Sequence, residues 1–450
     1  MFIRCLLHPM IEITPPTPFA EDPQESDREF PSTSGHEGDA GPSPNETEVQ
    51  ERGEPAPPEA APELMMEPMV EETGVPRPDG DRVPAVRIPG PGPFEAVGWL
   101  VGVVIVHLVA SVFMVVMVAM FAVVSSGDRT LAEQPKKMQE LVNSSIGVVM
   151  GGDQFLFVLA VLVAVGLRLA IPGDPQLGAM ARLHNRLGRL RIRLSHLLPL
   201  VAAVIPVSLA CGQLFQAANR VWRSLLEWMP GLPDVQTVQE VNVLSNLVES
   251  MPLPALVVVL AVLPAIGEEL VFRGAIGRGL VARCGVIRGV LLSSLLFAMA
   301  HVHPAHVISV FPLGVLLHIV YLATRSILAP VLLHFLVNGW AAILAHAFLR
   351  ADEGTVKLLS GDEAAPWYVL VPAVLSGIAA VGYFWQTRVE FQFENGRWWW
   401  PVYRSVECPP GPAAAVRLPV PARLSVLLGI AMVVFYAAFG WEVTRAVAGA

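Results

Sequence analysis

Long apolar segments recur along most of this 450-residue chain. A helix of about 20 apolar residues crosses the hydrocarbon core of a bilayer, and windows near that length repeat through the chain. The segments that we predict to span a membrane are 97–124, 154–170, 197–217, 252–272, 289–303, 306–323, 328–349, 366–386 and 424–444. The pattern therefore predicts an all-α polytopic membrane protein with about eight or nine transmembrane helices.

Residues 1–96 differ in composition from the rest of the chain. They hold 19 of the 40 prolines and 20 acidic against 6 basic residues. A segment so rich in Pro, Glu, Ser and Gly buries too little apolar surface to offset the entropy of ordering. We therefore predict a disordered acidic tail, with a docking arm for a partner as the alternative interpretation. The N-terminus lacks a small-residue cleavage site and does not look like a secretory signal.

Composition and charge exclude several classes of function. The chain is 53% hydrophobic and only 15% charged, against about 25% charged in ordinary soluble domains. The net charge of -9 supplies no basic face to neutralise phosphates, so we expect no nucleic-acid binding. The four cysteines lie far apart without a CxxC pair, which argues against a disulfide framework and a thiolate metal site.

Arginines between the predicted spans indicate the orientation. The connection from Arg168 to His196 contains five further arginines against one acid, so the positive-inside rule places it in the cytoplasm. The arginine-containing connection 387–423 falls on the same side, and the acidic connections 218–251 and 350–365 fall outside. We therefore expect the tail in the cytoplasm and the protein in a bacterial inner (cytoplasmic) membrane.

Ionisable residues interrupt the fourth apolar segment. Such a group costs about 2.5–3.5 kcal/mol at a helix centre, yet Glu268, Glu269 and Arg273 directly follow an apolar run. On a helix Glu269 and Arg273 share a face and can form an ion pair, whereas Glu268 points about 100° away from Glu269. We therefore interpret Glu269 and Arg273 as structural support and Glu268 as the free general base.

The next apolar segment adds a histidine. Glu268 and His301 are equally far along the chain from the turn at Cys284 and Gly285, so a helical hairpin would place them at the same depth. Phe297 lies one turn before His301 on the same face, where its ring would wall the site. The spacing thus predicts that a base and a second proton-handling group meet.

A later segment carries His334 and Asn338, four residues apart on one helical face. Two side chains that donate hydrogen bonds toward one point suit the stabilisation of an oxyanion. Packing between helices is the alternative for any one of these polar residues, and for the Glu269–Arg273 pair. Because all six polar side chains fall together, we favour a functional site.

The remaining histidines have plainer interpretations. His303 and His306 belong to a proline-containing turn, and we expect them to face solvent, with a zinc site formed together with His301 as the alternative. His318 and His346 are single residues in apolar helices, and we expect them to pack there.

Three motifs occur in order within the segment of about 70 residues that carries these groups: EELVFR fits EExxxR, FAMAH fits FxxxH, and HFLVN fits HxxxN. This set resembles the family of CAAX proteases and bacteriocin-processing enzymes, which contains the type II CAAX prenyl endopeptidases, over roughly residues 250–350. The resemblance implies an intramembrane endopeptidase of the glutamate type that needs no metal or other cofactor.

The resemblance also implies roles for the residues. Glu268 with His301 would activate a water for attack on a peptide carbonyl, while His334 and Asn338 would bind the oxyanion. The Glu269–Arg273 pair would support the site. The partners would be the lipid bilayer and a membrane-associated protein or peptide substrate.

With this resemblance the chain divides into four parts. They are the tail (1–96), accessory transmembrane helices (97–250), a core similar to CAAX proteases (251–350) and C-terminal transmembrane helices with a cytoplasmic loop (351–450).

Three alternatives stay open at this point. A zinc ion on Glu268, His301 and His334 would bring the pKa of its water toward about 7. A membrane scaffold or immunity-type binding protein would keep the polar cluster for packing or partner recognition. A proton-coupled transporter would use buried carboxylates as a relay, although the segments show no obvious inverted repeat.

Overall fold

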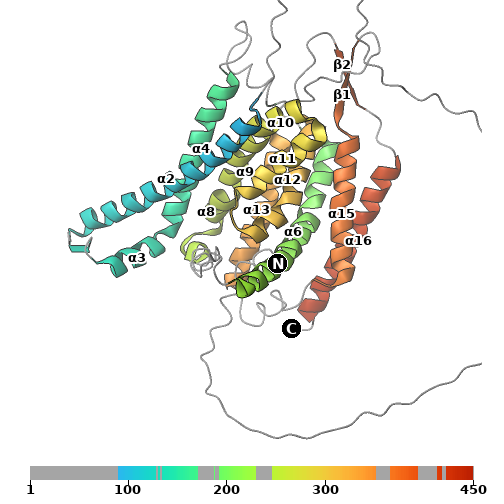
Figure 1. Ribbon diagram of the computed structural model, residues 1–450. Helices are drawn as coiled ribbons and strands as arrows, with labels where there is room; N and C mark the ends of the chain where they lie inside the picture. Colours follow the sequence, from blue (N-terminus) through green and yellow to red (C-terminus); the bar gives the residue numbers. More distant parts are fainter. Residues whose placement is uncertain are drawn as a thin grey trace, which may run out of the picture. The chain divides into compact units, whose positions relative to one another are not determined.

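The computed structural model describes residues 90–127, 130–131, 134–170, 187, 192–229, 246–350, 365–393, 413–417 and 422–448. Most of the predicted tail and of the arginine-rich connection before His196 lies outside the described residues. The described residues fall in one compact unit that is almost entirely helical (Figure 1).

Eight helices within the described residues are long and apolar enough to cross a membrane. In chain order these are α2 (Pro93–Ser126), α4 (Ile146–Ala170), α6 (Leu194–Trp228), a continuous run from Leu253 to Cys284, α12 (Pro304–Thr324), α13 (Leu328–Arg350), α15 (Trp367–Gln386) and α16 (Ala422–Ala448). The predicted fold class of a polytopic helical membrane protein is confirmed.

One predicted span is too short to cross a bilayer. The segment 289–303 corresponds to α11 (Val286–Met299), which has 14 residues, whereas a span needs about 20. The chain leaves the helix after Met299 and turns before Pro304, where α12 begins. His301 therefore lies in a turn between two helices and not within a transmembrane helix.

A small β-hairpin, which the sequence did not predict, lies in the connection between α15 and α16. Strands β1 (Val389–Phe393) and β2 (Ala413–Arg417) are antiparallel, with Val389 paired to Arg417. A short amphipathic helix, α3 (Pro135–Ser144), connects α2 and α4.

The run that carries the glutamates is not a regular α-helix. It consists of α8 (Leu253–Val257), π-helical η3 (Val258–Val262), α9 (Leu263–Glu269), π-helical η4 (Leu270–Gly277) and α10 (Arg278–Cys284). π-helical turns are wider than α-helical turns and are frequent at functional sites. Glu268 and Glu269 thus end a short α-helical segment between two π-helical ones.

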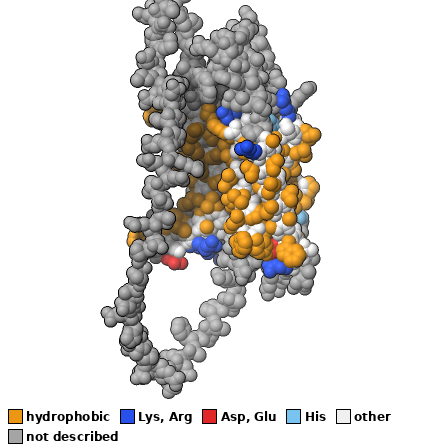
Figure 2. All heavy atoms as spheres, turned by 90° about the vertical axis from the view of Figure 1, so that its right-hand side faces the viewer, with side chains coloured by type: hydrophobic (Ala, Val, Ile, Leu, Met, Phe, Trp, Pro, Cys, Tyr) orange, Lys and Arg blue, Asp and Glu red, His pale blue; other side chains and the backbone are white. Residues whose placement is uncertain are grey.

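The bundle buries its middle helices most deeply. In Figure 1, α2 and α4 lie together at one side and α15 and α16 at the other, with α11, α12 and α13 between them. In the apolar stretch of α12, 72% of residues are buried, against 11% in α2. Figure 2 shows an apolar face bordered above and below by charged side chains, as expected for a surface embedded in lipid.

Helix α6 contains two prolines in its interior, Pro199 and Pro206. A proline has no N–H for the carbonyl four residues before it, and an unpaired carbonyl is costly in a bilayer. Here each of these carbonyls accepts a hydrogen bond of 2.9 Å from a tyrosine hydroxyl, one from Tyr383 of α15 and one from Tyr436 of α16. The two tyrosines therefore tie the C-terminal helices to α6.

Candidate active site

Glu269 is the centre of a buried polar cluster. Its side chain is 0% exposed, and its Oε1 accepts hydrogen bonds from Arg273 Nη1 at 2.5 Å and from His334 Nδ1 at 2.8 Å. Arg273 also donates from Nη2 to the carbonyl of Gly314 at 3.0 Å. The guanidinium lies over the ring of Phe297, 4.3 Å from its centroid. The ion pair expected from the four-residue spacing forms, and it joins the glutamate helix to α11, α12 and α13.

His334 lies between the two adjacent glutamates. While Nδ1 bonds to Glu269, Nε2 is 4.0 Å from Oε2 of Glu268. Because the Glu269 carboxylate next to Arg273 acts as an acceptor, Nδ1 carries the proton. The Glu268 side chain is 20% exposed, and its Oε2 has no hydrogen-bond partner. The two glutamates thus differ: one holds the imidazole and the other faces its free nitrogen.

His301 lies on the other side of Phe297. The Phe297 ring contacts His301 and His334 edge-on, with centroid distances of 5.4 and 5.7 Å. The carbonyl of Phe297 is 3.2 Å from Nδ1 of His301, and because a carbonyl only accepts, that nitrogen is the donor. Within the described residues no hydrogen bond or ion pair links His301 to Glu268.

A cavity of about 210 Å³ brings several of these groups together. Its wall includes His301, His334, Asn338 and Phe297 and is otherwise mainly apolar, with contributions from α6, η3, α12 and α13. Three of the four predicted catalytic side chains therefore share one cavity. Glu268 is not among the lining residues, but its Oε2 lies 4.0 Å from Nε2 of His334, which does line the cavity.

The turn that carries His301 has an unusual backbone. Val302 adopts φ of 60°, which is rare for a β-branched residue and costs of the order of 1–3 kcal/mol. Directly after it, His303 accepts a hydrogen bond from Ala305 N and so caps the start of α12. The strained turn and the cap together fix the position of His301.

The expectation that His303 and His306 face solvent is wrong. His303 is 3% exposed, and His306 lines the cavity and stacks on His301 at 6.3 Å. The reason is tertiary, since Phe215 of α6 packs against both rings, at 6.1 and 4.5 Å, and covers the turn. His318, expected to pack in an apolar helix, is buried.

A second buried polar group was missed from the sequence. Asp153 is 7% exposed and accepts hydrogen bonds from His107 Nδ1 at 2.9 Å, Ser111 Oγ at 3.0 Å and Gln154 Nε2 at 3.2 Å. The predicted span 154–170 begins just after Asp153, but α4 begins at Ile146 and includes this residue. The sequence signal that could have indicated this group is His107, an ionisable residue within the first apolar segment.

The described residues contain no group of three or more His, Cys, Asp or Glu side chains placed to hold a metal ion. Of the three residues of the zinc alternative, His301 and His334 both contact the Phe297 ring, and Oε2 of Glu268 lies 4.0 Å from Nε2 of His334.

The fold and this cluster define an integral membrane protein with a buried glutamate–histidine site. Residues 250–340 match the family described as Type II CAAX prenyl endopeptidase Rce1-like. The matched segment contains all three motifs, so the family recognised from them is confirmed there, and the family is one of CAAX-type intramembrane proteases. No curated protein and no solved structure matches the chain.

Proposed function

We propose that the protein is an intramembrane endopeptidase that cleaves a peptide bond of a membrane-associated protein or peptide. The observation that carries this proposal is the placement of His334: Glu269 holds Nδ1, and Nε2 faces Glu268 at the wall of a cavity shared with His301 and Asn338. A site that activates water needs such a base beside a space for the carbonyl.

The proposed reaction uses Glu268 as the general base. Glu268 takes a proton from water as the oxygen attacks the carbonyl carbon, and it returns that proton to the nitrogen when the C–N bond breaks. His301 assists, because its Nδ1 donates to a carbonyl and leaves Nε2 free to accept from the same water.

Asn338 and His334 stabilise the oxyanion in this proposal. The amide of Asn338 reaches the cavity and can donate a hydrogen bond directly. His334 already donates Nδ1–H to Glu269, so it donates from Nε2 only as an imidazolium. In that form it would lie between the two carboxylates, with Arg273 paired to Glu269.

Replacing Glu268 tests the proposal. We expect Glu268→Gln to abolish cleavage while the protein still inserts and purifies as a single species, so that a precursor accumulates in the membrane fraction. The matched control is Glu227→Gln, a change at an exposed glutamate near the end of α6. Normal processing by the Glu268→Gln protein would contradict the mechanism, and an unchanged phenotype would favour a scaffold.

We further propose that the reaction uses no metal. Metal analysis of the purified protein, together with cleavage measured after chelation, tests this. Retained cleavage without bound metal is expected, whereas loss on chelation that is restored by added zinc would support the metal alternative.

The orientation is also a proposal, with the N-terminal tail in the cytoplasm of a bacterium. Cys5 lies in the tail, and it should react with a membrane-impermeant maleimide only after the inner membrane is permeabilised. Labelling in cells with only the outer membrane opened would reverse the orientation.

A further inference from the structure

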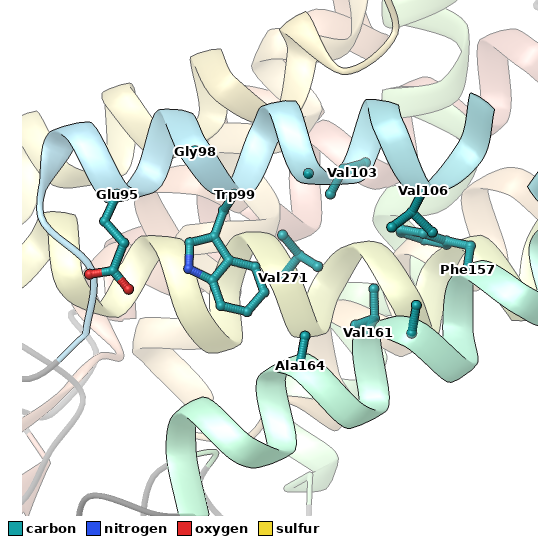
Figure 3. A pocket seen from close by; sticks show the side chains of 11 residues that line it. Glu95, Gly98, Trp99, Val103, Val106, Phe157, Val161, Ala164 and Val271 are labelled. Carbon is teal, nitrogen blue, oxygen red and sulfur yellow. The ribbon is translucent and has the colours of Figure 1, made fainter. Parts of the chain in front are cut away.

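A second cavity lies apart from the site around His334. It is a groove of about 390 Å³ between α2 and α4, and Val271 of η4 also lines it. Figure 3 shows Glu95 and Trp99 toward one end and Val106 and Phe157 toward the other. Apart from the Glu95 carboxylate, its lining is mainly apolar.

Small residues make the groove hollow. Gly98 and Gly102 on α2, and Ala160 and Ala164 on α4, are each four apart and so lie along the facing sides of the two helices. A Cβ added at Gly98 or Gly102 would meet nothing within 4 Å. Small residues usually let helices pack closely in a membrane, but here they leave space.

The length of the groove suits one lipid tail. From Glu95 to Val106 the helix rises about 16 Å at 1.5 Å per residue, and half of a hydrocarbon core of about 30 Å is similar. Gly98 of α2 and Ala164 of α4, which line the groove, are exposed. The groove therefore opens at the surface of the bundle.

An ion pair marks the end of the groove at Glu95. Arg168, in the last turn of α4, donates to the Glu95 carboxylate from Nε at 2.9 Å and from Nη2 at 3.3 Å. The Arg168 side chain is 32% exposed and the Glu95 side chain 43%, so both remain accessible. Opposite charges at one point complement a headgroup that carries a phosphate and an ammonium.

We propose that this groove binds one acyl chain of a zwitterionic phospholipid, with the phosphate at Arg168 and the ammonium at Glu95. Binding of the lipid is independent of the proposed protease function. Its effect on cleavage rests on that function, because the groove lies against the helix that carries Glu268.

The contact with that helix is direct. Val271 in the groove follows Glu269 by two residues. At the far end a Cβ on Gly267 would lie 2.5 Å from Cε1 of Phe157, so the ring packs on the backbone just before Glu268. An acyl chain would thus touch Val271, which follows the glutamates, and Phe157, which packs on Gly267 just before them.

The Phe157 end of the groove is held in place. His107 stacks on the Phe157 ring with centroids 4.2 Å apart, and Asp153 fixes His107 through a 2.9 Å hydrogen bond. The buried Asp153 cluster therefore has an evident role, which is to position the phenylalanine that supports the catalytic segment.

Lipid retention by the purified full-length protein tests the binding site. After exchange into mixed micelles with equal parts phosphatidylethanolamine and phosphatidylglycerol, we expect native mass spectrometry to detect one retained phosphatidylethanolamine. Gly102→Leu fills the groove and should weaken retention by about tenfold or more, equivalent to about 1.4 kcal/mol. The matched control, Gly166→Leu on α4, lies outside the groove with nothing within 4 Å and should retain the lipid.

Headgroup variants test the charge assignment. Glu95→Gln should reduce the preference for phosphatidylethanolamine over phosphatidylglycerol, because only the former carries an ammonium, whereas Arg168→Gln should weaken retention of both lipids, because both carry the phosphate. Equal retention of both lipids by the unaltered protein, retention by Gly102→Leu, or a bound molecule without phosphate would each overturn the proposal.

The effect on cleavage is measured separately. Added phosphatidylethanolamine should raise the activity of the unaltered protein and of Gly166→Leu but not that of Gly102→Leu. Glu268→Gln should bind the lipid and lack activity, so a failure of the protease proposal leaves the binding result intact. Equal stimulation of Gly102→Leu would overturn the coupling.

Discussion

Replacing the two adjacent glutamates by glutamine, one at a time, should affect different properties. Glu269→Gln should lower stability, whereas Glu268→Gln should abolish cleavage and leave stability nearly unchanged. Glu269→Gln removes the charge that pairs with Arg273 and leaves an amide oxygen in place of the carboxylate that accepts from Arg273 and His334. Glu268→Gln removes a carboxylate whose Oε2 lies 4.0 Å from Nε2 of His334. The perturbations are chemically identical, so only the surroundings differ.

The structure gives the expected magnitudes. Glu269 is 0% exposed and Arg273 1%, and breaking such a pair leaves a buried charge unpaired at about 3–5 kcal/mol. Because the glutamine oxygen still accepts one hydrogen bond, we expect the lower end, about 3 kcal/mol. For Glu268→Gln we expect a change within about 0.5 kcal/mol, as for other sites without a strong partner.

Chemical denaturation in detergent measures these free energies of unfolding. A second variant, Glu269→Gln with Arg273→Met, should be more stable than Glu269→Gln alone, because no buried charge remains. Equal stability of the two single variants, or a less stable Glu268→Gln, would refute the assignment of Glu269 as support and Glu268 as base.

Five other substitutions, in three sets, test the packing, each by the free energy of unfolding. Gly267→Ala should destabilise by about 1–3 kcal/mol because its Cβ meets an aromatic ring at 2.5 Å, whereas Gly166→Ala, in open space, should stabilise by about 0.5–1 kcal/mol; stabilisation at both would contradict the close contact. Tyr383→Phe and Tyr436→Phe should each cost about 1 kcal/mol, since each leaves a carbonyl without its donor, and two neutral changes would show that the hydroxyls are dispensable. Asp153→Asn should cost about 1–3 kcal/mol by weakening the hydrogen bonds from α2; no loss would remove the case for an anchor there.

Hydropathy located most spans because crossing a bilayer is a property of one segment. It failed where contacts with another helix determine whether a segment is helical. The stretch before residue 154 contains two glycines and Asp153 and looks like a loop, yet it is helical because His107 and Ser111 of α2 satisfy the carboxylate. Hydropathy also overextended α11, since a hydropathy window does not register the turn at 300–303 that ends the helix.

The contacts within the site are also of two kinds, those between residues close in sequence and those between residues far apart in sequence. The Glu269–Arg273 pair depends on a spacing of four and was predicted, although η4 is π-helical and not α-helical there. The contact between Glu269 and His334 joins residues 65 apart in the chain. Sequence spacing placed His334 with Asn338 on one face, and both do line the cavity, but it did not reveal what holds the other ring nitrogen.

That second contact supports the proposal that Glu268 is the base. Adjacent residues on a helix point in different directions, which suggested two roles, and one imidazole lies between the two carboxylates. Its protonated Nδ1 and the guanidinium both occupy Oε1 of Glu269, whereas Oε2 of Glu268 keeps no partner and faces Nε2. In the proposed mechanism the carboxylate already engaged by two donors supports the site, and the other is the general base.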